Sequence, residues 1–109
     1  MAHEYKTFSI HQLQEEEEVL KGKLAQAKQD GIKNRIAIYS RKIEVVRSFM
    51  LDPKDFQPGD TFELIEDPDH LFEINEVKGV FVWGYRINRQ TNIKLDEEGF
   101  LLVMLGEKV

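Results

Sequence analysis

The chain changes character at Pro53, and this boundary constrains the fold more than any motif does. From Ser9 to Leu51 the apolar residues recur at helical spacing. From Thr61 to Leu105 they occur in short runs of strand-forming residues separated by turn signals. We therefore expect an α+β protein with a helical part, residues 1–52, and a β part, residues 53–109. Because two separate cores would be marginal in 109 residues, we expect one cooperative folding unit.

The helical part predicts an antiparallel hairpin of two helices. Ser9 with Gln12 three residues later fits a capping box at the start of the first helix, and Gly31 fits its left-handed end. The second helix carries an apolar seam with alternating steps of four and three: Ile32, Ile36, Tyr39, Ile43, Val46 and Met50. Ile38 and Val45 widen this stripe, so we expect the second helix also to cover the β part.

The β part predicts four or five short strands in roughly 50 residues, which is typical of a small, strongly bent sheet or barrel. The expected strands are Thr61–Ile65, Leu71–Val77, Val80–Ile87, Ile93–Leu95 and Phe100–Leu105. We expect an acidic loop at Glu66–Asp69 and a turn at Asp96–Gly99. Gly84, in the middle of the best strand, predicts a bend or a close approach of another backbone.

That strand has two contrasting faces. One face carries Phe81, Trp83, Tyr85 and Ile87, and the other carries Val80, Val82, Gly84 and Arg86. The aromatic face has two interpretations. We favour a buried core, because the hairpin has few other ways to cover its stripe. The alternative is a partly open groove for a peptide or a nucleotide, with Trp83, Tyr85 and Arg86 as candidate binding residues.

Charge is distributed unevenly along the chain. The net charge is −5, with +1 in residues 1–52 and −6 in residues 53–109. Residues 19–50 carry eight basic and two acidic residues. A basic face of the second helix, formed by Arg35, Arg41, Lys42 and Arg47, is therefore a candidate for binding nucleic acid, although the acidity of the whole chain opposes this.

The sequence contains little that supports catalysis. Without cysteine there is no disulfide, zinc–thiolate site or thiol nucleophile, and no serine nucleophile motif or phosphate-binding glycine loop occurs. A metal site would need His70 with Asp67 and Asp69, an acidic turn that is more typical of a solvated loop. We expect no enzyme activity, no cofactor and no metal. We also expect a cytoplasmic protein, since no signal peptide or membrane-spanning run appears.

Two stretches carry a family resemblance, Leu51–Phe62 and Gly79–Arg86, the second with an unusual Trp-Gly-Tyr-Arg motif. With the preceding hairpin they resemble the YfhH-like family of small uncharacterised proteins from Gram-positive bacteria. The resemblance implies an SH3-like barrel that follows a helical hairpin, and it implies no functional residues.

These observations lead to two hypotheses about function. The first is a non-catalytic binding module for a protein partner, because a small barrel and a hairpin lack a catalytic constellation. The alternative is a nucleic-acid binder that uses the basic face of the second helix.

Overall fold

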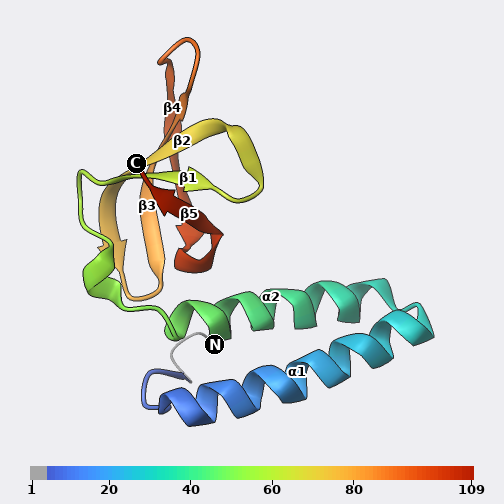
Figure 1. Ribbon diagram of the computed structural model, residues 1–109. Coiled ribbons are helices and arrows are strands. Elements are labelled where there is room, and N and C mark those ends of the chain that lie inside the picture. The colour runs from blue at the N-terminus through green and yellow to red at the C-terminus, as the bar shows by residue number, and fades with distance from the viewer. Residues whose placement is uncertain (1–4) are drawn as a thin grey trace. The chain divides into compact units, whose positions relative to one another are not determined.

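The computed structural model describes residues 5–109, in a chain that divides into two compact units, residues 1–50 and 51–109 (Figure 1). Residues 1–4, on which the expectation of no signal peptide partly rests, lie outside the described residues. Within residues 5–109, no helix has the length and apolar character needed to cross a membrane. Cooperative folding of the two units stays a prediction.

The first unit is a hairpin of two helices, α1 (Ile10–Asp30) and α2 (Lys33–Phe49). The predicted capping box is confirmed. The backbone N–H of Gln12 donates to the Ser9 hydroxyl at 3.1 Å, and the backbone N–H of Ser9 donates to the Gln12 side chain at 2.8 Å. Gly31 ends α1 in the left-handed conformation, with a φ of 67°.

The facing sides of the helices form a core of their own. Its buried members are Tyr5, Leu13, Leu20, Ile43 and Val46. Ile43 and Val46 confirm the predicted seam of α2. Ile38, which widens the stripe, is 49% exposed, and Ile10 at the start of α1 is 54% exposed.

The second unit begins with a 3-10 turn, η2 (Pro53–Asp55), and continues into five antiparallel strands. The strands are β1 (Thr61–Leu64), β2 (Asp67–Lys78), β3 (Phe81–Asn88), β4 (Lys94–Leu101) and β5 (Leu105–Lys108), with a second 3-10 turn, η3 (Leu102–Met104), before β5. Their order in the sheet is β4-β3-β2-β1-β5, and within the described chain no backbone pairing joins β4 to β5 (Figure 1). The sheet is therefore open and does not close into a barrel, which corrects the barrel implied by the resemblance, whereas the predicted α+β class is confirmed.

Three boundaries in the β part differ from the prediction. The acidic segment at 67–69 belongs to β2, and the expected turn at 96–99 lies inside β4. The expected last strand, 100–105, is divided between β4, η3 and β5. In β4, Glu98 pairs with Gly84 and Gly99 pairs with Trp83 across the ladder. Pairing with a neighbouring strand thus outweighs the local turn preference of acidic residues and glycine.

The two faces of the sheet differ in burial. The inner face holds the core of the unit, with Phe62, Leu64, Phe72, Ile74 and Val82 all buried. Gly84 confirms the predicted close approach, since a Cβ at this position would lie 2.0 Å from the backbone oxygen of Glu73. The outer face carries the aromatic row, and there Trp83 is 40% exposed. The favoured interpretation, that the aromatic face is the core, is therefore wrong for Trp83.

Candidate functional site

The most exposed aromatic side chain of the sheet, Trp83, is held in place by a glycine. Trp83 on β3 pairs with Gly99 on β4, and a Cβ at Gly99 would lie 2.8 Å from two carbons of the indole ring. The ring therefore lies directly on the Gly99 backbone, an arrangement in which an aromatic side chain covers a glycine on the neighbouring strand. One side of the indole is fixed and the other is open to solvent.

Carboxylates and one lysine surround the aromatic row. Glu73 and Glu97 are the cross-strand neighbours of Tyr85 on either side. Lys94 Nζ lies 2.8 Å from Glu73 Oε1 and 5.0 Å from the centre of the Tyr85 ring. The hydrogen bond with Glu73 raises the pKa of Lys94. Tyr85 is thus covered by a paired cation, whereas Trp83 is the more accessible ring of the row.

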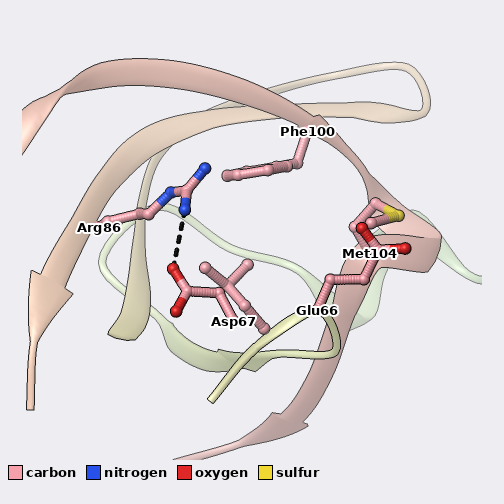
Figure 2. A pocket seen from close by; sticks show the side chains of 6 residues that line it. Glu66, Asp67, Arg86, Phe100 and Met104 are labelled. Atoms are coloured by element: carbon pink, nitrogen blue, oxygen red, sulfur yellow. Dashed lines mark hydrogen bonds and ion pairs between the residues drawn. The ribbon is translucent and has the colours of Figure 1, made fainter. Parts of the chain in front are cut away.

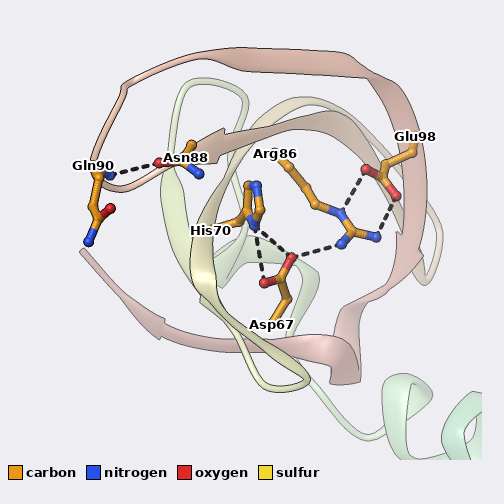
Figure 3. A network of polar contacts seen from close by, with 6 residues as sticks. All are labelled: Asp67, His70, Arg86, Asn88, Gln90 and Glu98. Carbon is orange, nitrogen blue, oxygen red and sulfur yellow. Dashed lines mark hydrogen bonds and ion pairs between the residues drawn. The ribbon is translucent and has the colours of Figure 1, made fainter.

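Arg86, the third candidate binding residue on β3, lies on the inner face. There its guanidinium group donates hydrogen bonds to carboxylates of the same unit (Figure 3). Its Nε and Nη2 donate to the two oxygens of Glu98 at 2.8 and 3.0 Å, and its Nη1 donates to Asp67 at 2.7 Å. The guanidinium carbon lies 5.2 Å from the centre of the Phe100 ring. The hydrogen bonds from Arg86 to Glu98 are the main cause of the raised pKa of this arginine.

Asp67 joins this arginine to a histidine. His70 Nδ1 lies 3.1 and 3.0 Å from the two carboxylate oxygens of Asp67. The hydrogen bond with His70, followed by that with Arg86, lowers the pKa of Asp67. Residues 5–109 contain no group of three or more histidines and carboxylates placed to hold a metal. His70 and Asp67 are joined by a hydrogen bond within the protein.

Two hollows flank this network. One has a volume of about 160 Å³ and is lined by Leu64, Glu66, Asp67, Arg86, Phe100 and Met104 (Figure 2). The other, of about 340 Å³, is lined by Pro68, Asp69, His70, Asn88, Arg89 and Gln90. Neither lining includes a serine, threonine or cysteine, so neither hollow offers a nucleophile beside a base.

Within the part of the chain that the structure describes, two of the four residues in the predicted basic face of α2 form ion pairs and two do not. Arg47 forms an ion pair with Glu17 of α1, and Arg41 lies 3.8 Å from Glu44. Arg35 and Lys42 form no ion pair within residues 5–109. Only two of the four predicted residues therefore keep a charge that has no counterion nearby.

The sequence did not lead us to predict a hollow at the end of the hairpin where the turn at Gly31 joins α1 to α2. It has a volume of about 110 Å³ and is lined by Lys23, Gln26, Ala27, Asp30, Arg35 and Tyr39. A signal for it was present, because residues equally distant from the turn of a helical hairpin tend to face each other. Lys23 and Tyr39 lie eight positions before and after Gly31, and Ala27 and Arg35 lie four positions from it.

Comparison with known proteins places the whole chain in one family. Residues 3–106 match the model of a family described as a protein of unknown function, DUF1811. The chain belongs to this family. It is also 35% identical over 108 residues to the uncharacterized protein YfhH of Bacillus subtilis (strain 168), an alignment that covers 99% of both chains. The resemblance suggested by the Trp-Gly-Tyr-Arg stretch is thereby confirmed.

The family match extends over most of both units, and the alignment with the relative covers the hairpin and the sheet. Neither description assigns an activity.

Proposed function

We propose that this protein is a non-catalytic protein-interaction module that binds its partner through the outer face of the sheet around Trp83. One observation carries the proposal: the only tryptophan of the chain is 40% exposed although its ring is fixed on Gly99. A rigid exposed indole loses little conformational entropy on binding, and tryptophan is enriched among the residues that dominate binding energies at interfaces.

The surroundings of Trp83 indicate the chemistry of the partner. Glu76 on β2 is the cross-strand neighbour of Trp83, and Glu73 and Glu97 flank Tyr85. Residues 53–109 carry a net charge of −6. A segment with an arginine or lysine beside an apolar side chain would complement this surface, because a cation stacks favourably on an indole and is attracted by the surrounding carboxylates.

The same proposal includes an SH3-like class for the sheet and a cytoplasmic location. The small antiparallel five-stranded sheet, with one 3-10 turn before its last strand, supports the SH3-like class. Domains of that class bind extended peptides on grooves lined by aromatic residues, which suits the outer face described above.

Site-specific photocrosslinking in cells that express the full chain tests this proposal. A photoreactive amino acid in place of Glu76, next to Trp83, is expected to give a discrete protein adduct. The same amino acid in place of the exposed Glu107 on β5 serves as the matched control and is expected to give none. Trp83→Ala is expected to remove the adduct while the chain stays folded, as checked by thermal melting. A folded protein that gives no adduct from position 76, or the same adduct with Trp83→Ala, contradicts the proposal.

A second candidate function is nucleic-acid binding through α2, which is favoured by the unpaired charges of Arg35 and Lys42. Phosphate contacts predict an affinity that falls steeply with salt. Fluorescence anisotropy with DNA and RNA oligonucleotides at low salt is expected to show binding that Arg35→Glu weakens. Absence of binding, or binding that does not respond to salt, would rule it out.

A further inference from the structure

The fold brings two cations and one hydroxyl group together at the connected end of the hairpin. Lys23 comes from α1, whereas Arg35 and Tyr39 lie one turn apart on α2, and all three line the hollow of about 110 Å³. Ala27, which is buried, also lines the hollow. Its methyl side chain leaves space between the helices that a larger side chain would fill.

The lining of this hollow contains two cations and one carboxylate, so its net charge is positive. Neither Lys23 nor Arg35 has a carboxylate within 4 Å among residues 5–109, although Lys21, Arg41 and Arg47 all have one. Asp30 is the one acidic residue in the lining, and it accepts a hydrogen bond from Gln26 at 3.0 Å. Two like charges that share a small hollow repel each other unless an anion lies between them.

Tyr39 adds a neutral donor to the two cations. It is half-buried, and no hydrogen bond of its hydroxyl group occurs in the described part of the chain. The guanidinium, ammonium and hydroxyl groups of the three lining residues are donors that suit the oxygens of a tetrahedral anion. A hollow of this size is well below the roughly 300 Å³ of a pocket for a whole small molecule, so it fits a single group.

We propose that Lys23, Arg35 and Tyr39 form a binding site for one phosphate group between the two helices. The source of the phosphate is either the free ion or the backbone of a nucleic acid. If the phosphate belongs to a nucleic acid, the inference rests on the second candidate function, nucleic-acid binding through α2, and locates one bound backbone phosphate.

Titration of the full chain with inorganic phosphate, followed by the amide resonances of the hairpin, tests the site. Saturable shifts at Lys23 and Arg35 are expected, and sodium chloride at equal ionic strength is expected to give none. Arg35→Gln removes a charge-assisted hydrogen bond and is expected to weaken phosphate binding by about 10- to 100-fold. Tyr39→Phe is expected to weaken it by a smaller factor. Arg41→Gln, which removes the same charge from a paired arginine of the same helix, is expected to leave phosphate binding unchanged.

The site is contradicted if inorganic phosphate gives no saturable shift with a folded protein, or if Arg41→Gln reduces binding as much as Arg35→Gln does. A parallel titration with a short oligonucleotide separates the two sources. If phosphate binds and the oligonucleotide does not, the site stands and the nucleic-acid function fails. If the oligonucleotide binds equally well to both glutamine variants while phosphate binding depends on Arg35, the site stands for the free ion and is not where a nucleic-acid backbone binds.

Discussion

The two faces of β3 are both apolar in sequence, yet only one of them forms the core of the sheet. On the inner face Val82 is fully buried, whereas on the outer face its neighbour Trp83 is 40% exposed. The strands curve around the inner face, as the view in Figure 3 shows, so that face has less space for each residue. It accommodates Gly84 and Val82, and the outer face has room for the larger rings. Hydrophobicity alone therefore does not tell which face of a bent strand is buried.

The largest expected effect concerns whether the inner face by itself stabilises the sheet. We predict that residues 53–109 expressed alone fold poorly and aggregate, because a fragment of roughly 60 residues buries too little surface to be more than marginally stable. Thermal melting followed by circular dichroism, with the full chain as the control, measures this. A sharp two-state transition of the fragment would show that the core on the inner face is sufficient to fold the sheet without the hairpin. This result would overturn the prediction of one cooperative unit.

A direct comparison of the faces comes from truncating one aromatic side chain on each. Phe72→Ala on the inner face is expected to lower the free energy of unfolding by about 3–5 kcal/mol, because Phe72 is fully buried. Trp83→Ala is expected to lower it by about 1–2 kcal/mol, because the ring is already partly solvated. Chemical denaturation of both variants gives the two values.

The native fluorescence of Trp83 provides the control for this comparison. Strong quenching by acrylamide, a neutral quencher that the surrounding carboxylates do not repel, is expected from an exposed indole. If acrylamide does not quench the native protein and Trp83→Ala costs as much as Phe72→Ala, the outer face is covered in solution and cannot be the binding surface.

The glycines of the two faces provide a sharper test. Gly84→Ala on the inner face is expected to cost about 3 kcal/mol or more, because the new Cβ would meet the backbone oxygen of Glu73 at 2.0 Å. In Gly99→Ala on the outer face, the atoms nearest to the new Cβ belong to the Trp83 ring at 2.8 Å, and displacing this ring toward solvent is expected to cost about 1 kcal/mol. The Gly99 variant is also expected to shift the emission of Trp83 to longer wavelength. Equal losses of stability for the two variants would contradict the difference between the faces.

The smallest expected effect concerns the polar end of the inner face. The pKa of Asp67 is lower in the folded protein than its ordinary value of 3.8, so folding favours the ionised form. This contribution to stability is fully present above pH 3.8 and is lost as the pH falls through the lowered pKa. Asp67→Asn is expected to reduce the loss of stability between pH 5 and pH 2, as measured by urea unfolding across this range. An unchanged pH dependence in the variant would show that Asp67 is not stabilised by His70 and Arg86.

Local patterns predicted the helical unit well. The capping box at Ser9, the left-handed Gly31 and the seam through Ile43 and Val46 all depend on residues within one or two turns of each other. The ion pair of Arg47 with Glu17 was not predictable in this way, because the partners lie on different helices and 30 positions apart. The hollow beside Lys23 was missed although its lining residues lie at equal distances before and after Gly31 in the sequence.

By itself, the sequence determined the division near Pro53, the hairpin and the alternation of β3, because helical and strand periodicities are set by neighbouring residues along the chain. Only the tertiary structure decided that β4 includes residues 96–99, that the sheet stays open, and that Trp83 lies on the more exposed face. These features depend on which strand supplies the hydrogen bonds and on how the sheet bends. They arise from contacts between residues that are distant in sequence, such as Trp83 with Gly99 and Gly84 with Glu73.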